Sequence, residues 1–528
     1  MADTDIGLEN ASLAELQQAL TDGKTNSTAL TRGYIARIAA YDSAGSAINS
    51  VRQVNPEALA IAGLRDQDRP SKSHPLAGIP ILVKDNCATG DRQHTTAGSA
   101  ALDGAGARQD STVVSRLRAA GAVILGKANL TEFANILAID MPAGYSSLGG
   151  QVKNAYVLDL DDKNVPIVPP GGSSSGSAVA VAAGLCAAAI GTETSGSLLS
   201  PATQNGLVTV KPTVGLISRA GIIPIAHSQD TAGPLTRTVR DAAILLNVLA
   251  AHDQADPATQ HLQRAADYTA ALDKDGLKGA RIGLPSDPSD PGNDFYYRKL
   301  TARSKQVMDE VIQVLQDGGA EVIRANIPTI GWMGGPSTQM AVLNRNPESR
   351  TKFDPAYRPV VFLYELKHDL NLYLRDWAKG TSIRTLADIV AFNQAHADKA
   401  LRFGQDLFLA SEATKGDLSE AEYHAARAVD IRSSRTEGLD AYMDQHKLDA
   451  VLFPGWGGAA IAAKAGYPSV QVPAGFTAGL NGKDTPDYPL GATFCGRAWS
   501  EATLLRIAYA YEQASNARKP PTLYPALA

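Results

Sequence analysis

Two short segments rich in glycine and serine hold the residues of this sequence that are best suited to covalent chemistry. Residues 170–177 read PGGSSSGS and residues 191–197 read GTETSGS, with a run of mostly small, apolar residues between them. Glycines in loops allow positive φ angles and close approach of the backbone to a ligand. Consecutive backbone N–H groups in such loops can bind an oxyanion, and both loops offer serine hydroxyls beside those groups.

The segment 170–177 has two other interpretations. Glycine–serine runs are typical of flexible linkers, but an apolar helix that must be buried follows this one at once. Residues 172–176 also match the G-x-S-x-G nucleophile elbow, with Ser174 as the nucleophile. That motif needs a strand directly before it, and residues 165–170 contain three prolines, which central strands disfavour. We therefore favour neither interpretation.

A lysine at the end of an apolar run is the third candidate group. Residues 80–83 read PILV and predict a short strand, which Lys84, Asp85 and Asn86 follow. A lysine has a reference pKa of about 10.4, and burial lowers this pKa because a low-dielectric site disfavours the charged amine. A lone lysine at a strand end is ordinarily a surface residue, but the adjoining apolar run favours burial of this one.

The histidines and cysteines show no spacing that predicts a metal site. None of the nine histidines forms an H-x-x-x-H or H-E-x-x-H pair, so we expect no metal and no cofactor. We expect His227 to be packed or solvent-facing. Three cysteines are too few and too scattered for a disulfide framework. We interpret Cys87 and Cys186 as small buried hydrophobic residues, and the third cysteine is Cys495.

The elements around these groups alternate between strands and helices over residues 75–250. The prediction places strands at 80–83 and 122–125 and helices at 111–120 and 177–190. Such alternation is typical of an α/β sheet covered by helices. Residues 1–70 precede this core as helices, and Ser12 and Glu15 form a capping-box pattern at the start of the first one.

The second half of the chain departs from this alternation and then returns to it. From about 285 to 445 the sequence has longer amphipathic helices, more charge and more aromatic residues, which predicts a helical insert over the sheet. The Pro/Gly-rich stretch 285–293 is a candidate boundary. Residues 446–528 return to the core sheet, beginning with the apolar run 448–453. We predict a single domain over residues 1–528.

The composition is that of an ordinary soluble globular protein. Of the 528 residues 44% are hydrophobic and 20% are charged, and the net charge of −5 is spread along the chain, which argues against a nucleic acid partner. The longest apolar stretch, 178–190, is shorter than the roughly 20 residues that span a bilayer. Because the N-terminus lacks a basic and apolar leader, we expect a cytoplasmic protein, or a periplasmic one if a leader was removed. We also expect a monomer or a homodimer.

Taken in order, these motifs resemble those of the amidase signature enzymes. That family has a Lys-Asp segment at a strand end, a GGSSxGS loop and a G-T-[DE]-T-x-G-S loop. Lys84 and Asp85 match the first, and Ser173 and Ser197, which are 24 residues apart, match the two loops. Further family motifs are matched at residues 201–202, 210–213, 228–234, 465–468, 472–473 and 489–491. The resemblance covers nearly the whole chain and is weakest in the expected insert.

The resemblance implies an amidase signature fold, in which a single large mixed β-sheet is covered by helices. It also implies a Ser-Ser-Lys triad that forms an acyl-enzyme without a cofactor. Ser197 would be the nucleophile, Ser173 on a cis peptide bond would be the bridge, and Lys84 would be the base. The oxyanion would be bound by the backbone N–H groups of Thr194, Ser195, Gly196 and Ser197. Asp85 and Asp230 are expected to be structural partners.

Within the family, the segments 172–181, 228–234 and 391–396 look most like the peptide amidases, which release ammonia from the C-terminal amide of peptides. Members that act on acidic substrates often have an arginine soon after the nucleophile. Residues 197–200 read SLLS, which favours a neutral acyl group. Aromatic residues of the insert are expected either to line the pocket or to pack in the core of the insert, namely Phe362, Tyr364 and Tyr373.

Two departures from the family pattern bear on the substrate. Ser195 stands where many members have glycine, and the polar stretch 159–163 lengthens the approach to Ser173, as a surface loop or as part of the entrance. Three alternatives to a peptide amidase therefore stay open. They are a broad-specificity aryl or fatty acyl amidase or esterase, a glutaminase-type subunit of an amidotransferase, and a non-catalytic binding protein of the same fold.

Overall fold

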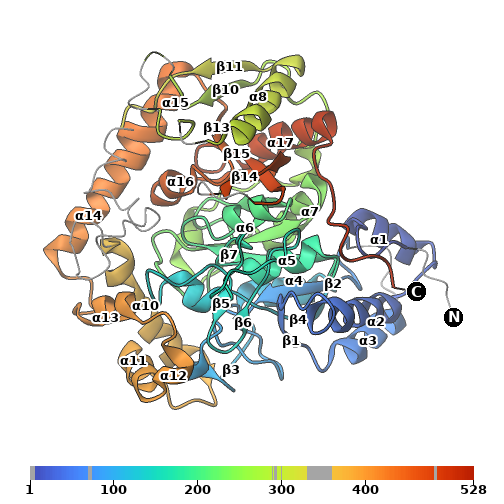
Figure 1. Cartoon of the computed structure of the whole chain (residues 1–528), viewed down its shortest axis with the longest axis vertical. Coiled ribbons are helices and arrows are strands. Elements are labelled where there is room, and N and C mark those ends of the chain that lie inside the picture. The colour runs from blue at the N-terminus through green and yellow to red at the C-terminus, as the bar shows by residue number, and fades with distance from the viewer. Residues whose placement is uncertain are drawn as a thin grey trace.

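The computed structural model of the chain describes residues 6–68, 74–287, 289, 294–298, 300–329, 359–480 and 485–527. Within these ranges one sheet of eleven strands forms the centre of the molecule, and helices cover it (Figure 1). The expected single large mixed sheet covered by helices is confirmed. No helix of the described ranges is long and apolar enough to cross a membrane.

The central sheet combines parallel and antiparallel neighbours. From one edge to the other its strands are β1 (Val51–Val54), β4 (Val123–Ala128), β2 (Pro80–Lys84), β7 (Ala188–Glu193), β9 (Thr231–Thr236), β8 (Val208–Lys211), β14 (Ser469–Thr477), β15 (Tyr488–Cys495), β13 (Ala450–Pro454), β10 (Arg281–Leu284) and β11 (Glu321–Arg324). β2 is parallel to both β4 and β7, and β10 is parallel to both β13 and β11. The five pairings between β7 and β13, and that of β1 with β4, are antiparallel.

The helices fall into a group that precedes residue 330 and a group that follows residue 359. The first group is α1 (Leu13–Thr21), α2 (Ser27–Arg37), α3 (Ala58–Asp68), α4 (Thr112–Ala119), α5 (Ser175–Ala182), α6 (Leu199–Gln204), α7 (Val239–Leu249) and α8 (Ala302–Asp317). The second group is α10 (Val360–Asp376), α11 (Leu386–Ala395), α12 (Ala397–Ala400), α13 (Asp406–Glu412), α14 (Ala421–Ile431), α15 (Ala441–His446), α16 (Ala459–Ala465) and α17 (Glu501–Ser515).

The first helix begins where the capping pattern predicts. The Ser12 hydroxyl accepts a hydrogen bond from the Glu15 amide, and the Glu15 carboxylate accepts one from the Ser12 amide, so the capping box is confirmed. Figure 1 shows α1–α3 on the same side of the molecule as the C-terminus. There Arg37 of α2 donates hydrogen bonds to the carbonyl oxygens of Tyr524 and Pro525, which holds the two ends of the chain together.

The segment 177–190, predicted as one helix, is a helix followed by a strand. α5 ends at Ala182, and β7 begins at Ala188. The prediction was therefore wrong for residues 183–190, of which 183–187 form a turn and 188–190 begin the strand. Alanine and isoleucine fill buried helices and buried strands alike, so an uninterrupted apolar run has no periodicity that separates the two.

The range 285–445, predicted as a helical insert, begins instead with part of the sheet. α8 connects β10 to the parallel strand β11, and together they form a β–α–β unit at one edge. The insert of helices starts only at α10, and Figure 1 shows α10–α14 along one side of the molecule. Most of the candidate boundary 285–293 lies outside the described residues.

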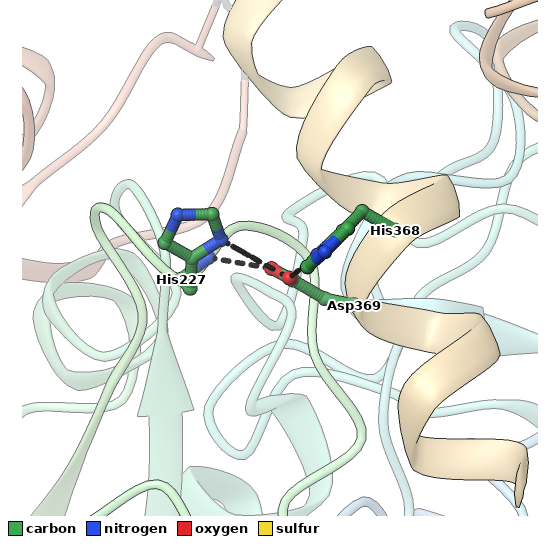
Figure 2. A group of neighbouring side chains, drawn as sticks. All are labelled: His227, His368 and Asp369. Carbon is green, nitrogen blue, oxygen red and sulfur yellow. Dashed lines mark hydrogen bonds and ion pairs between the residues drawn. The ribbon is translucent and has the colours of Figure 1, made fainter. Parts of the chain in front are cut away.

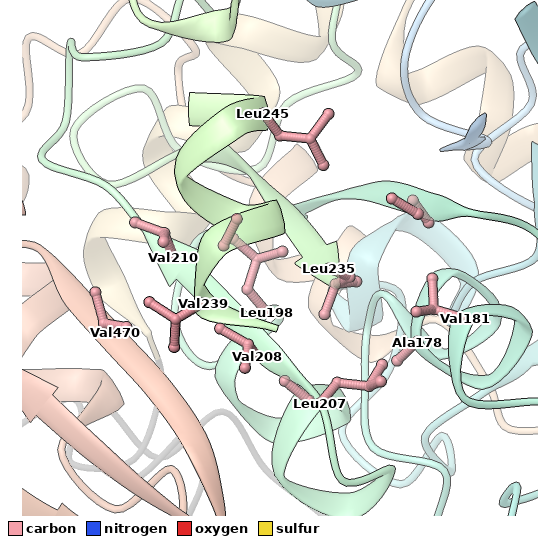
Figure 3. Packing of buried hydrophobic residues seen from close by; sticks show 14 of the residues in the cluster. Ala178, Val181, Leu198, Leu207, Val208, Val210, Leu235, Val239, Leu245 and Val470 are labelled. Atoms are coloured by element: carbon pink, nitrogen blue, oxygen red, sulfur yellow. The ribbon is translucent and has the colours of Figure 1, made fainter. Parts of the chain in front are cut away.

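The part of the sheet that carries the candidate site packs against α7 and against α5, whose side chains are small. Figure 3 shows Leu198, Val208 and Leu235 beside residues of α5 and α7. Gly176 of α5 lets this helix approach closely, because a Cβ there would lie 2.2 Å from the Ser50 carbonyl oxygen. The short distance between α5 and the sheet follows from residues that fill little space.

We expect Leu235→Ala to lower the free energy of unfolding by about 2–5 kcal/mol, because it removes methyl groups from a fully buried part of the core. Urea denaturation followed by circular dichroism measures this change. Leu64→Ala is the matched control, because Leu64 is 57% exposed on α3 and its truncation should change the free energy by about 0.5 kcal/mol or less. Equal losses in both variants would contradict the core position of Leu235.

Candidate active site

The carboxyl ends of two neighbouring strands bring the chemically interesting segments together. Lys84 is the last residue of β2, and Thr192 is the second-last residue of β7. The two strands run parallel and pair at Val83 and Ile190. Because parallel strands end at the same edge of a sheet, the side chains that follow these pairs meet at one place.

The Lys84 amine is surrounded by hydroxyl groups in the interior. Its side chain is fully buried, and Nζ lies 2.7 Å from Ser173 Oγ, 3.0 Å from Ser174 Oγ and 2.9 Å from Thr192 Oγ1. None of the ion pairs found among the described residues includes this lysine. Burial lowers the pKa of Lys84 to about 7 and outweighs the opposite effect of more distant acidic groups. The lysine therefore loses its proton far more readily than an ordinary one.

Ser173 follows a cis peptide bond with Gly172, as the family resemblance implies. Its side chain is fully buried, and its carbonyl oxygen accepts a hydrogen bond from the Thr131 amide at 3.0 Å. Gly171, just before, has a φ of 71°, and a Cβ there would lie 2.4 Å from Pro201 Cα. Only glycine fits this turn, which is thereby held directly against α6.

Ser197 lies on the turn between β7 and α6. The Glu193 carboxylate holds this turn, because its Oε2 accepts hydrogen bonds from the amides of Leu198 at 2.8 Å and Leu199 at 3.0 Å. The Ser197 carbonyl oxygen accepts a hydrogen bond from the Ser174 amide at 3.2 Å. This last bond joins the two glycine–serine segments through their backbones.

The same turn presents unpaired backbone donors. In the part of the chain that the structure describes, no protein oxygen accepts a hydrogen bond from the backbone N–H groups of Thr194, Ser195, Gly196 and Ser197. All four residues line one cavity. A set of fixed N–H donors that face a cavity is suited to binding an oxyanion.

That cavity has a volume of about 580 Å³. Ser197 lines it with 7% of its surface exposed, whereas Ser173 and Lys84 are fully buried. The walls combine polar side chains with apolar ones, and the apolar ones include Ile136, Ile139, Ile225, Phe362, Trp456 and Leu480. Among the described lining residues Lys464 alone is charged, and its amine pairs with Asp430 at 3.0 Å. The cavity is therefore suited to an uncharged group.

Two polar residues near Lys84 were not singled out from the sequence. Thr192 exchanges hydrogen bonds with the Ser174 hydroxyl through its amide at 3.2 Å and its carbonyl oxygen at 3.0 Å. The Asn86 side chain donates to Thr192 Oγ1 at 3.0 Å. Both residues lie inside the motifs that contain Lys84 and Ser197, and this position was their only signal in the sequence.

The two other interpretations of the segment 170–177 are wrong. Ser174 is fully buried at the start of α5, and no strand directly precedes it among residues 165–170, so it is not the nucleophile of an elbow. Residues 173–177 are all buried, which a flexible linker would not be.

Asp85 and Asp230 bind structural partners, as expected. The Arg52 guanidinium lies 2.5 Å from the Asp85 carboxylate. The Asp230 carboxylate accepts hydrogen bonds from the Thr194 hydroxyl at 2.5 Å and from two amides of the loop 225–230 at 2.9 Å. Burial raises the pKa of Asp230 to about 6, although these hydrogen bonds act in the opposite direction. Asp230 thus connects the loop 225–230 to residue Thr194 of the turn that precedes Ser197.

The cysteines lie in the interior. Cys87, Cys186 and Cys495 are buried free thiols, and burial raises the pKa of each to about 11 or 12. A thiol with a raised pKa is a poor nucleophile. The interpretation of Cys87 and Cys186 as small buried hydrophobic residues is confirmed.

The aromatic residues of the insert divide between the two predicted roles. Phe362 lines the cavity and packs in a buried cluster, whereas Tyr364 and Tyr373 pack in buried clusters away from this cavity. The stretch 159–163 is a surface loop, because its residues are mostly exposed and none of them lines the described cavity. His227 is partly exposed and lies against Asp369 of α10.

The chain matches the family model described as Amidase over residues 29–505. A solved structure of native peptide amidase from Stenotrophomonas maltophilia has a TM-score of 0.83 and 40% sequence identity, and the match covers 99% of this chain and 100% of that one. A protein of Arabidopsis thaliana described as a probable amidase is 36% identical over 526 residues, which cover 98% of this chain and 92% of that protein. A glutamyl-tRNA(Gln) amidotransferase subunit from Thioalkalivibrio sulfidiphilus is 32% identical over 516 residues, which cover 96% of this chain and 98% of that protein.

The chain therefore belongs to the amidase family, and the resemblance to the amidase signature enzymes is confirmed. It is an amide-hydrolysing enzyme.

Gly191→Ala is expected to lower kcat/KM for an amide substrate about 100-fold, because misplacement of reacting groups by about 1 Å has an effect of this size. A Cβ at this position would lie 2.7 Å from both Ser174 Oγ and Leu198 Cδ2, so it would push the two glycine–serine segments apart. Steady-state kinetics with both purified proteins measures the ratio.

Gly63→Ala is the matched control for this substitution. Gly63 lies within α3, and the nearest atom to an added Cβ is Thr28 Oγ1 at 3.9 Å, so the rate should not change. A Gly191→Ala variant as active as Gly63→Ala would contradict the close contact between the two segments.

Proposed function

We propose that this enzyme hydrolyses neutral carboxamides, with peptide C-terminal amides as the substrate class, through Ser197, Ser173 and Lys84. The observation that carries the proposal is the contact of 2.7 Å between Lys84 Nζ and Ser173 Oγ, both fully buried next to a turn whose Ser197 lines a cavity. The described residues that line this cavity include no histidine and no carboxylate. We therefore assign the role of base to Lys84, whose pKa is lowered to about 7 and whose Nζ contacts Ser173 Oγ.

In the first step the neutral amine of Lys84 accepts the proton of the Ser173 hydroxyl, and Ser173 Oγ accepts the proton of the Ser197 hydroxyl. Ser197 Oγ forms a bond to the amide carbon, and the electrons of the carbonyl π bond move to its oxygen. The backbone N–H groups of residues 194–197 bind the resulting oxyanion. Removal of one such donor in a serine hydrolase raises the barrier by about 3–4 kcal/mol.

In the second step the protonated Lys84 returns its proton through Ser173 to the leaving nitrogen. The carbon–nitrogen bond breaks, ammonia leaves, and the acyl group stays on Ser197 as an ester. A water molecule then attacks this ester with the same proton relay in reverse. The products are a carboxylic acid and the free Ser197 hydroxyl, so atoms and charge balance over the cycle.

The cavity supports a neutral and partly apolar acyl group. Its Lys464 amine is already paired with Asp430, so the cavity has no free positive charge for an acidic substrate. Phe362 and Trp456 offer aromatic surface to side chains of a peptide. The 40% identity to a peptide amidase over 99% of this chain supports the same substrate class.

A glutaminase-type subunit of an amidotransferase is the second candidate. The 32% identity to a glutamyl-tRNA(Gln) amidotransferase subunit favours it, although this identity is lower than that to the peptide amidase. The two candidates differ in their need for a partner. A free-standing amidase is active as an isolated chain, whereas a glutaminase-type subunit would depend on the rest of its complex.

Ammonia release from C-terminally amidated peptides and free amino-acid amides tests the proposed reaction. The purified chain is expected to release ammonia from the peptide amides, and Ser197→Ala is expected to lower this rate by about 10⁴-fold or more, because loss of a serine nucleophile has effects of this order. Coupled detection of ammonia gives the rate for each substrate.

The matched control for this experiment is Ser43→Ala, since Ser43 is an exposed serine that does not line the described cavity. This variant should have the wild-type rate. Ammonia release from glutamine alone, and only after addition of partner subunits, would support the second candidate. A folded chain with no activity on any of these amides would overturn the proposal.

The pH profile of kcat/KM tests the role of Lys84. The neutral amine is the active form, and burial places the pKa of Lys84 near 7, so kcat/KM should fall about tenfold per pH unit below about pH 7 and level off above it. The rate is measured from pH 5 to pH 9, with circular dichroism to show that the fold is retained. A rate that stays constant down to pH 5 would exclude Lys84 as the base.

A further inference from the structure

Two histidines far apart in the sequence meet at the contact between the core and the insert. His227 lies on the loop 225–230, and His368 and Asp369 lie on α10. Figure 2 shows the Asp369 carboxylate between the two imidazole rings. Spacing within the sequence could not reveal this group, because one histidine is contributed by each of two segments that meet only in the fold.

The distances within the group are short. Asp369 Oδ1 lies 3.0 Å from His227 Nδ1 and 2.8 Å from His368 Nδ1, and Asp369 Oδ2 lies 2.9 Å from His227 Nδ1. The ligand atoms of the three side chains all lie within 4.8 Å of one another. The three residues therefore converge on one point.

We propose that His227, His368 and Asp369 bind a divalent transition-metal cation of the Zn²⁺ class. Two ligand atoms at about 2.0–2.1 Å from a tetrahedral Zn²⁺ are about 3.3 Å apart. Each histidine Nδ1 lies 2.8–3.0 Å from an oxygen of Asp369, so these pairs need to separate by only a few tenths of an ångström to reach that spacing. Two imidazoles and a carboxylate are ligands that Zn²⁺ prefers, and the fourth position stays open for water.

The surroundings of the group suit a cation. The Asp369 side chain is largely buried, and its carboxylate accepts hydrogen bonds from both histidines. A second buried carboxylate, that of Glu365, lies 3.6 Å from His227 Nδ1. Its two oxygens accept hydrogen bonds from the Ser228 amide and the Tyr423 hydroxyl, so it adds negative charge from a fixed position.

A cation can reach the group from solvent. The side chains of His227 and His368 are 43% and 33% exposed. His227 and Asp369 also line a second cavity, of about 250 Å³, whose lining includes Thr194 of the turn with free N–H groups. The cation would thus bind beside a cavity that also reaches Thr194, three residues before Ser197.

Binding would fasten the loop 225–230 to α10. The same loop is tied to Thr194 through the Asp230 carboxylate, so the cation would also restrain the oxyanion turn. This inference does not depend on the proposed substrate or on the proposed triad. Its consequences are measured without any amidase assay.

Titration of the metal-free, untagged, full-length chain with ZnCl₂ tests the proposal. Isothermal titration calorimetry is expected to show one saturable site per chain, and the midpoint of thermal unfolding should rise with the Zn²⁺ concentration. His227→Ala and His368→Ala should each weaken Zn²⁺ binding at least about tenfold, because each removes a ligand. Both side chains are partly exposed, so we expect the variants to fold.

His252→Ala is the matched control, because His252 is an exposed histidine that lies outside this group. It should keep the wild-type affinity for Zn²⁺. Binding of Co²⁺ gives a spectroscopic readout, since its visible absorption depends on the ligands and should be lost in His227→Ala and His368→Ala. Absence of a saturable site in the wild-type chain, or unchanged binding in the double variant, would overturn the proposal.

Discussion

A lysine amine buried among hydroxyl groups imposes the main constraint on this active site. Burial lowers the pKa of Lys84 to about 7 from 10.5, so between these pH values the unfolded chain binds a proton that the native state releases. The native state therefore loses stability as the pH falls from about 10.5 to about 7, and the loss stays constant below that. Hydrogen bonds with Ser173, Ser174 and Thr192 offset part of this loss. Hydroxyl groups can form hydrogen bonds with either the neutral or the protonated amine. A nearby carboxylate would instead stabilise the protonated amine.

This arrangement depends on three segments that the fold holds in close contact. β2 and β7 are parallel neighbours, which places Lys84 next to Thr192. The loop with Ser173 is pressed against α6 at Gly171, where no side chain has room. Glu193 fixes the turn with Ser197 through two backbone amides. The geometry of the proposed catalytic site thus depends on backbone contacts more than on long side chains.

Much of this could be predicted from the sequence, because short motifs with fixed spacing specify local structure. The strand before Lys84, the capping box at Ser12 and the cis peptide bond at Ser173 were all expected and are present. The first three residues of β7 were predicted as helix, because two alanines and an isoleucine fit either element. β11 was assigned to the insert, because a short, partly exposed strand has little hydrophobic pattern. The approach of His227 to His368 depends on how the insert packs, which local patterns do not encode.

The two parts of the active site differ in how freely they can change. The proposed reacting groups come from segments at one edge of the sheet whose backbones are closely packed, where even a methyl group at Gly171 or Gly191 has no space. The cavity walls come from separate elements, since Phe362 belongs to α10, Trp456 precedes α16 and Leu480 follows β14. These elements are separate from β2 and from the two glycine–serine segments that carry the proposed reacting groups. A fold of this kind can acquire new substrates by small steps while its chemistry stays the same, which makes the walls the natural place for directed evolution to begin.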